Sequence, residues 1–594
     1  MNIKFPLKTV CILGIIHLLF SCSDLKFGDE LLNQQPEGTG ATLDSMFCSK
    51  VNADKVLTKA YTELPYGLPV GGRDRLGPSI LEAITDFAQD NLEWTGNGAR
   101  ELYYTGALSA NSINGSAAYY FTGENDWTAI RYGWLFIENV EKVPDMSESE
   151  KAQRIAEAKM IIAISYAGMF RNIGGVPWLD HAVQPNEDMN YPRLTFAETV
   201  DRIIGLIDEA IPNLKWTQTE ADDGRMTKAG AMALKLRVLT FAASPAFNSN
   251  TPYHPNANEY ACYGNEDRNR WKRAMEAGEE LMKAIQNNGY YGLVQPKGDS
   301  HIDRRLAFRE AYYDRGTSES LISTRVSSSN VNSEFHWNSS AGCPTLNYVN
   351  MFPWADGEKF PEDFDWKNPT KAPFYEEYSE KDGEGLSPTR DPRLYETVAV
   401  PGSHYWDGNI VASYTNSPNY NKKLSGFYLM KWDLPSGADR EGHLSHWPYL
   451  RFAESLLSYA EAINEYKNGP DATAYDCVND VRRRVGLSDL KENMNQTEFR
   501  EALLQERACE LGFEEVRWYD LVRWKMEKDF RKPLYGLRTK GLGSDVYHPT
   551  GYTYEPFLLE TRNWNTKWDT KWYLAPIPQK EVNKNYGMTQ NPGW

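Results

Sequence analysis

The sequence predicts a mainly α-helical protein, in which tetratricopeptide-like helix pairs stack into a superhelix that carries long irregular loops and a few short strands. Apolar residues recur at intervals of three and four in a series of segments, first between residues 125 and 285 and again between 448 and 525. Each segment alone has too little apolar surface to stand free, and stacking on its neighbours would cover it. Between the two series, residues 287–447 are rich in glycine, proline, asparagine and aromatic residues, a composition typical of loops.

The N-terminus has the build of a secretory signal. A basic start precedes an apolar run over residues 10–20, which is shorter than the ~20 apolar residues that span a bilayer. The stretch LFSCSD (19–24) resembles a bacterial lipobox, in which the chain is cut before the cysteine and the cysteine carries the lipid, although Phe20 is larger than the residue usual there. We therefore expect a lipoprotein signal peptide over 1–21 and lipidation of Cys22.

The composition argues against several classes of function. The net charge of -17 argues against nucleic acid as a partner, because phosphate binding needs a concentrated basic surface. No GxSxG, HExxH or phosphate-cradling loop stands where one would be needed, and we expect no cofactor. Five cysteines follow Cys22: Cys48, Cys262, Cys343, Cys477 and Cys509. Their odd number and the lack of CxxC or CxxH spacing argue against a disulfide framework and a zinc site, and we expect most of them to be buried.

A polar tether over residues 22–45 leads into the N-terminal helical half, residues 46–286. Thr195 and Glu198 have capping-box spacing at the start of one helix, and Pro144 ends another. We predict helices over 125–144, 152–170, 195–214, 227–244 and 270–285.

Residues 287–447 form the predicted ligand-binding region, because long loops in a compact protein are usually functional. Short strands, such as one over 395–400, fit its sequence. Helices return in the C-terminal region, residues 448–594. We predict them over 448–466, 473–486 and 497–525.

Four alternating charges in the last of these helices stand three residues apart: Glu514, Arg517, Asp520 and Arg523. On one side of a helix they can pair in sequence, and we interpret them as a structural charge ladder flanked by packed tryptophans. The alternative takes Glu510 and Glu514 as the acid and nucleophile of a glycosidase. Neighbours on one helical face cannot flank a sugar from opposite sides, so we reject the catalytic interpretation.

His443 and His446, in HLSHW, are the nearest approach to a pair of metal ligands. No third ligand stands at helical spacing, and the segment is loop-like. We therefore expect a loop or structural role for both histidines and no metal site.

Several long motifs occur in a fixed order along the chain. In the N-terminal half they are EAKMIIAISYAGMFRNIGGVPWL (157–179) and TKAGAMALKLRVLTFAASPAFN (227–248), and MFPWADG and RDPRL follow in the middle. The C-terminal region holds PYLRFAESLLSYAEAINE (448–465), VNDVRRRVGL (478–487), ERACELGFEEVRWYDLVRW (506–524) and YLAPIPQKEVNKNYGMTQNPGW (573–594). Over most of its length after Cys22 the chain resembles the SusD/RagB outer-membrane lipoproteins of Bacteroidetes.

The resemblance implies one SusD-like domain over 46–594, built on four tetratricopeptide-like helix pairs with loops that carry a ligand site. Members of the family sit on the cell surface, cap a SusC-like TonB-dependent barrel, and deliver oligosaccharides or, in some members, peptides to it. They bind and do not catalyse. Family motifs often mark the fold and not the site, so the ligand residues need a separate argument.

Aromatic residues in the glycine- and asparagine-rich loops are the candidate sugar contacts, because the apolar C–H faces of sugars lie flat on aromatic rings while amides and carboxylates bind the hydroxyls. The first candidate is Trp94, with Asp90, Asn91, Asn97 and Arg100 as hydrogen-bonding neighbours. The second is Trp337 with Asn338, and the third is the pair Tyr290 and Tyr291. Trp406 is an outside candidate, whereas Trp354 lies in a motif shared with the family and is expected to pack structurally.

Three classes of function follow from these observations. We expect a glycan-binding lipoprotein, anchored in the outer membrane at the cell surface, that passes oligosaccharide to a SusC-like transporter. A peptide-binding RagB-like protein on the same scaffold is the first alternative. An exported glycan hydrolase is the second, and it would need two carboxylates that face each other across a cleft.

Overall fold

The computed structural model describes residues 42–68, 79–90, 99–112, 124–326, 342–378, 386–405, 410–411, 415–416, 425–432, 446–546 and 549–594. The predicted signal peptide, Cys22 and most of the tether lie outside these residues. Within the described ranges, no helix combines the length and the apolar character needed to cross a membrane.

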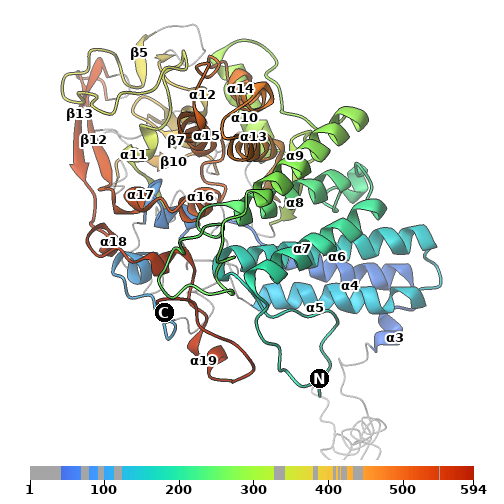
Figure 1. The fold of residues 1–594 in the computed structure, drawn as a ribbon. Helices are drawn as coiled ribbons and strands as arrows, with labels where there is room; N and C mark the ends of the chain where they lie inside the picture. Colours follow the sequence, from blue (N-terminus) through green and yellow to red (C-terminus); the bar gives the residue numbers. More distant parts are fainter. Residues whose placement is uncertain are drawn as a thin grey trace, which may run out of the picture.

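A row of packed helices forms one side of the molecule (Figure 1). Each helix of the row packs against the next, in the order of the chain. The row consists of α4 (Lys50–Thr62), α5 (Glu124–Asn139), α6 (Glu148–Ile173), α7 (Phe196–Ala210), α8 (Lys228–Ala243) and α9 (Asn269–Asn288). The mainly α fold with stacked helix pairs is thus confirmed.

The row continues in space after a long interruption in sequence. Helix α9 packs against α13 (Phe452–Lys467), and α13 in turn contacts α14 (Ala472–Arg484) and α15 (Gln496–Glu510). A single buried hydrophobic cluster runs from Phe47 to Leu574. The two series of helices predicted from the sequence therefore share one core.

Local capping fixes where several of these helices begin. Thr195 accepts a hydrogen bond from the N–H of Glu198, whose carboxylate accepts one from the N–H of Thr195, so the predicted capping box is confirmed. The same reciprocal arrangement joins Ser147 and Glu150 at the start of α6. Such caps satisfy backbone donors that the first helical turn leaves unpaired.

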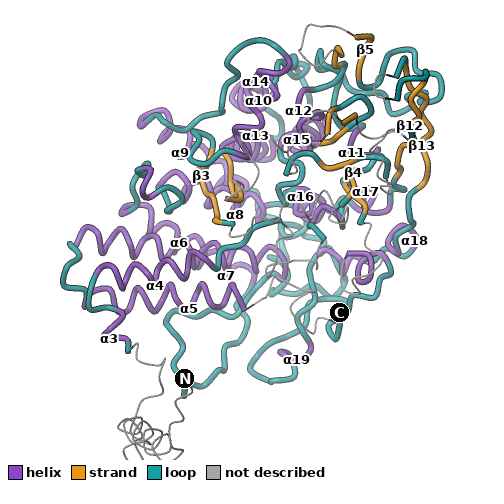
Figure 2. The backbone as a smooth tube through the Cα atoms, turned by 180° about the vertical axis from the view of Figure 1, so that it is seen from behind, coloured by secondary structure: helices purple, strands orange, loops and turns teal. Residues whose placement is uncertain are grey.

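The described strands form only two-stranded antiparallel sheets, which lie among the loops (Figure 2). The longest is the hairpin of β12 (Tyr535–Leu542) and β13 (Gly551–Leu558), at the end of the molecule away from α9. The other pairs are β2 (Ala88–Gln89) with β4 (Cys343–Pro344), β3 (Ser320–Arg325) with β11 (His446–Arg451), β5 (Tyr375–Tyr378) with β6 (Leu386–Pro388), β7 (Val398–Ala399) with β10 (Tyr428–Leu429), and β8 (His404–Tyr405) with β9 (Ile410–Val411).

The structure also describes α10, which is as long as α4, and seven shorter α-helices. Their bounds are α3 (Leu43–Met46), α10 (His301–Tyr313), α11 (Leu346–Val349), α12 (Pro392–Thr397), α16 (Arg517–Arg523), α17 (Glu527–Arg531), α18 (Asn563–Thr566) and α19 (Gln579–Val582). Helix α10 lies within the region expected to hold loops and short strands, so that part of the prediction was incomplete.

Two element predictions were only partly right. In the strand expected over 395–400, residues 395–397 belong to helix α12, which Asp391 caps and Pro392 opens, and only the two residues of β7 are strand. The helix expected over 497–525 is broken between α15 and α16. Phe513 and Glu515 take positive φ angles of 61° and 59° there, which a continuous helix excludes.

The cysteines follow the prediction. Cys262, Cys343, Cys477 and Cys509 are buried free thiols, and Cys48 is an exposed free thiol.

Candidate ligand-binding groove

The charged residues of the shared motifs, together with Glu319 and Lys431, form a buried ion network. Arg393 contacts Asp391, Glu506 and Glu510 at 2.7, 2.6 and 3.0 Å. The network joins five cations to five carboxylates, and all ten side chains are buried. The cations are Arg393, Lys431, Arg451, Arg482 and Arg484, and the carboxylates are Glu319, Asp391, Glu506, Glu510 and Glu514. The signs balance, so these motif residues hold the fold and do not form a site.

The network also rules the Glu510–Glu514 pair out of catalysis. Arg451 lies between the two carboxylates, 3.1 Å from Glu510 and 2.7 Å from Glu514. Burial acts to raise the pKa of Glu510, but the charges of Arg484, Arg451 and Arg393 hold it well below its usual range. A buried, permanently ionised carboxylate cannot act as a general acid on a sugar.

The predicted ladder of Glu514, Arg517, Asp520 and Arg523 is structural, as expected, but it does not pair in sequence. Within it, Asp520 contacts Arg523 at 2.8 Å, whereas Arg517 binds Asp86 of a distant segment at 2.7 Å. The break between α15 and α16 separates Glu514 from the other three, and Glu514 binds Lys431 and Arg451 instead.

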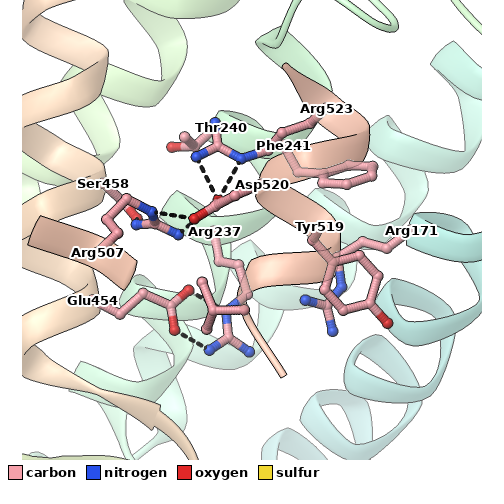
Figure 3. A pocket seen from close by; sticks show the side chains of 11 residues that line it. Arg171, Arg237, Thr240, Phe241, Glu454, Ser458, Arg507, Tyr519, Asp520 and Arg523 are labelled. Carbon is pink, nitrogen blue, oxygen red and sulfur yellow. Dashed lines mark hydrogen bonds and ion pairs between the residues drawn. The ribbon is translucent and has the colours of Figure 1, made fainter. Parts of the chain in front are cut away.

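A second cluster of charges surrounds a small cavity between helices of both halves (Figure 3). Asp520 accepts hydrogen bonds from Arg507 and Arg523, and the Nε of Arg237 donates to Glu454 at 2.7 Å. The cavity measures about 30 Å³. This is room for about one water molecule and not for an organic ligand.

A larger groove, of about 450 Å³, opens where three distant segments meet. The segment 218–227 between α7 and α8, the turn after α9 at Tyr290, and the segment from Arg315 into β3 line it. This feature, here called the Tyr290 groove, contains residues of the third candidate pair from the sequence.

Tyr290 lines the Tyr290 groove and is 57% exposed. Its backbone has a φ of 73°, a left-handed conformation that is costly for a tyrosine. Tyr291 is 8% exposed and supports the ring edge-on, with ring centres 5.0 Å apart. Trp216 packs on Tyr291 in turn and donates from Nε1 to the carbonyl of Gly289 at 2.9 Å.

Arginines and carboxylates on the other segments of the Tyr290 groove are paired with each other. Asp223 contacts Arg315 at 2.7 Å and Arg325 at 3.0 Å. Burial opposes its charge, but the hydrogen bonds from Arg325 and Arg315 hold the pKa of Asp223 below its usual range. Arg225 is bound by Glu157 at 2.8 Å.

Two residues that line the Tyr290 groove each carry a buried oxygen with no hydrogen-bond partner in the described part of the chain. These oxygens are the Oε1 of Gln218 and the Oγ1 of Thr317. The amide nitrogen of Gln218 donates to the carbonyl of Met226 at 2.9 Å, which fixes the orientation of its oxygen. Buried polar atoms normally have partners, so these two are exceptions close to the groove.

The first and second sequence candidates lie mostly outside the described residues. Trp94, Asn91, Asn97, Trp337 and Asn338 are in this group, as are Trp406 and His443. The residues that border these two loops are described, and Gln89 pairs with Cys343 in the β2–β4 ladder. The described residues Gln89 and Cys343 therefore lie side by side in this ladder.

Asp90 and Arg100 are described. Asp90 is fully buried and accepts a hydrogen bond from Ser79. Arg100 is half-buried and contacts Glu560 at 2.9 Å. Both hold neighbouring segments in place, and a role for either in ligand binding stays a prediction.

Trp354 and His446, for which the sequence predicts structural roles, are both buried in the packed structure. Trp354 is buried, with the Lys371 ammonium 4.1 Å from its ring centre. The Nε2 of His446 lies 2.7 Å from the carbonyl oxygen of Tyr313, and burial lowers the pKa of His446 to about 4. A neutral imidazole that donates from Nε2 fits this contact.

Sequence reasoning missed Trp216, Gln218, Asp223 and Thr317. Trp216 and Gln218 stand in the polar stretch KWTQTEADDGR between two helices, where an isolated tryptophan could have indicated a loop aromatic. Nothing in the sequence indicated that Asp223 and Thr317 would share a groove with Tyr290, because the three come from separate segments.

Comparison with known proteins identifies proteins that are similar to this chain in sequence and in fold. Residues 308–594 match the SusD family model. The SusD-like protein P38 of Formosa agariphila is 27% identical over 425 residues, which cover 68% of this chain and 73% of P38. The SusD-like protein P2 of the same organism is 33% identical over 27% of this chain, and the match spans 28% of P2.

The starch-binding protein SusD of Bacteroides thetaiotaomicron is 26% identical over 34% of this chain and 28% of its own length. Among solved structures, a SusD-like protein from Bacteroides fragilis superposes with a TM-score of 0.69 at 22% identity, over 93% of this chain and all of the other. A laminarin-binding SusD-like protein has a TM-score of 0.53 at 17% identity, over 92% of this chain and all of the other. The motifs, the stacked helices and these matches agree, and the chain belongs to the SusD/RagB family.

Proposed function

We propose that the protein binds a neutral oligosaccharide, and that the Tyr290 groove is part of the binding site. The observation that carries the proposal is an exposed tyrosine held in a strained backbone at a groove whose lining is rich in polar side chains. A sugar ring has one apolar face and several hydroxyls, and so it matches both features. The starch-binding relative supports a glycan as the ligand class.

The charges support a neutral sugar over an acidic one. Arg315 and Arg325 are engaged by Asp223, and Arg225 by Glu157. A uronate or sulfate would compete with these carboxylates for the arginines, and of their buried nitrogens only the Nη1 of Arg325 has no partner among the described residues. The ionised state of Asp223 also argues against glycan hydrolysis here, because a glycosidase needs a carboxylic acid with a raised pKa.

The rest of the proposal rests on the family. We propose that Cys22 carries the lipid, that residues 22–45 tether one domain over 46–594 to the outer membrane at the cell surface, and that the oligosaccharide passes to a SusC-like TonB-dependent transporter. Mass spectrometry of the mature N-terminus tests the anchor: a diacylated or triacylated Cys22 supports it, and an intact residue 1 contradicts it.

The glycan proposal is tested with two substitutions at one position. Tyr290→Asn removes the ring but suits the left-handed backbone, and Tyr290→Phe keeps the ring and loses the hydroxyl. We expect Tyr290→Asn to bind a neutral glucan or mannan about five- to tenfold more weakly, the equivalent of about 1–1.4 kcal/mol of stacking. Tyr290→Phe should stay close to wild type.

Affinity electrophoresis on a panel of neutral glucans, mannans and polyuronates measures this, with the melting temperature as the check on folding. Equal retardation of Tyr290→Asn and wild type by every retained glycan would exclude Tyr290 from the site. Retardation by polyuronates alone would contradict the neutral ligand.

A further inference from the structure

The small cavity of Figure 3 lies where helices of the two series meet, and its lining is rich in arginine. The cations come from four helices: Arg171 from α6, Arg237 from α8, Arg507 from α15 and Arg523 from α16. Two of these helices precede residue 287 and two follow residue 447. The cavity therefore sits at the junction of the two series, and it shares no lining residue with the Tyr290 groove.

Two of the arginines form a balanced group with two carboxylates. Asp520 accepts hydrogen bonds from the Nε of Arg507 and the Nε of Arg523, both at 2.9 Å. Glu461 accepts from the Nη2 of Arg523 at 2.8 Å. All four side chains are buried. Two positive and two negative charges thus compensate each other here without a further ion.

The other two arginines share a single carboxylate. Glu454 accepts from the Nε of Arg237 at 2.7 Å. Arg171 has no carboxylate in ion-pair contact among the described residues; its guanidinium carbon lies 4.1 Å from the ring centre of Tyr519, and its Nε is buried without a hydrogen-bond partner. In Figure 3, Glu454 approaches Arg237 from one side and Arg171 lies on the other. The group around the cavity therefore carries one positive charge in excess.

The surplus sets this group apart from the ion network of Arg393, in which five cations meet five carboxylates. A charge held inside a protein without compensation is costly, and a bound counter-ion removes that cost. The space beside the surplus measures about 30 Å³. A carboxylate, phosphate or sulfate group is too large for it, whereas a chloride ion is only slightly larger than the single water molecule that such a space can hold.

Hydrogen-bond donors are also available around the cavity. The Ser458 hydroxyl is buried in the lining and accepts from the Nη1 of Arg507 at 3.2 Å, and its own proton has no acceptor among the described residues. The Nη1 of Arg237 likewise makes no hydrogen bond within the described ranges, because Glu454 and the carbonyl of Tyr449 engage its Nε and Nη2. Guanidinium and hydroxyl groups can both donate to an anion.

We propose that this cavity binds one chloride ion, which compensates the charge of Arg171 and accepts hydrogen bonds from Arg237 and Ser458. The ion then joins α6 and α8 of the first series to α13 of the second. Because only the folded chain brings these helices together, bound chloride stabilises the fold. The proposal does not depend on glycan binding, since the two sites have no residue in common.

Exchange of chloride for gluconate at constant ionic strength tests the proposal on the full chain. Gluconate is too large for the cavity, so we expect the melting temperature of the wild type to rise by about 1–3 °C as chloride replaces it. Arg171→Met removes the surplus charge and keeps a contact with the Tyr519 ring, and its melting temperature should not respond to chloride. Arg273→Met is the control, because Arg273 is exposed and pairs with Asp201 at the surface; it should respond as the wild type does.

Bromide gives a direct measurement in case Arg171→Met does not fold. Bromide is chemically close to chloride, and its anomalous X-ray scattering marks its position in a crystal. We expect a bromide peak in wild-type crystals between Arg171, Arg237 and Ser458. The proposal is overturned if the cavity shows no such peak, if the wild type melts at the same temperature in both salts, or if Arg171→Met keeps the wild-type response to chloride.

Discussion

Glu82 is a buried carboxyl group beside a second acid. Burial raises the pKa of Glu82 to about 8, and the charge of Glu515 adds to the shift, although the N–H of Glu515 donates to the carboxyl at 2.6 Å. Between its ordinary pKa of 4.5 and about 8, the folded state holds a proton that the unfolded chain has released. This contribution to stability is complete below pH 4.5 and is lost as pH rises through about 8.

Glu82→Gln should therefore flatten the dependence of stability on pH. Glutamine keeps the oxygen that accepts from Glu515 and cannot ionise. We expect the free energy of unfolding of the wild type to fall relative to the variant by up to about 1.4 kcal/mol per pH unit across pH 5–8. Urea unfolding of both proteins at each pH measures the difference, and parallel curves would show that Glu82 ionises normally.

At the scale of single residues, the kind of side chain that could bind a sugar was easier to predict than its place in the structure. The sequence indicated Tyr290 and Tyr291 as loop aromatics, but not that Tyr291 would be buried support while Tyr290 is exposed, since that depends on a left-handed turn after α9. Asp223 and Thr317 meet Tyr290 only through the packing of three segments. Trp94 and Trp337 remain predictions.

At the scale of elements, the break between α15 and α16 depends on one close contact. A Cβ at Gly512 would lie 1.9 Å from the Tyr348 hydroxyl oxygen and 2.9 Å from the carbonyl oxygen of Ala508. Tyr348 is fully buried and cannot move away easily. The glycine therefore allows the chain to turn against Tyr348 and to place Glu514 in the ion network.

Gly512→Ala should destabilise the protein by about 1–3 kcal/mol through this overlap. The matched control is Gly205→Ala in α7, where an added Cβ meets nothing within 4 Å. That change should stabilise the protein by about 0.5–1 kcal/mol, because alanine favours a helix interior over glycine. Chemical denaturation of the two variants measures both effects, and an equal effect of the two substitutions would contradict the contact argument.

The helices that were predicted correctly are those whose sequence signals lie within the helix or at its ends. Apolar segments and caps predicted α5 to α9 because each signal lies within the helix or at its end. The same periodicity runs on from α15 into α16, so the turn at Gly512 was invisible to it. In α12, the capping residue Asp391 and Pro392 outweighed the strand-like composition that follows.

At the scale of the whole molecule, Arg523 joins helices from both halves. Its guanidinium donates to the Ser244 hydroxyl at the end of α8 at 3.1 Å, to Glu461 of α13 at 2.8 Å and to Asp520 of its own helix at 2.8 Å. Helix α9 also packs directly on α13. These contacts support our proposal that residues 46–594 form one domain.

A single domain predicts a single calorimetric unfolding transition. Arg523→Met should lower the melting temperature of this transition without splitting it. Removal of one partner leaves Glu461 and Asp520 as buried charges with less compensation, which costs about 3–5 kcal/mol. Arg483→Met is the control, because Arg483 is half exposed and its ion pairs with Asp480 and Asp489 are worth at most about 1 kcal/mol. The contradicting result is a split transition, in which one part melts at a lower temperature and the other keeps the wild-type melting temperature. In that case the helices before residue 287 and those after 447 would be separate folding units joined only by contact.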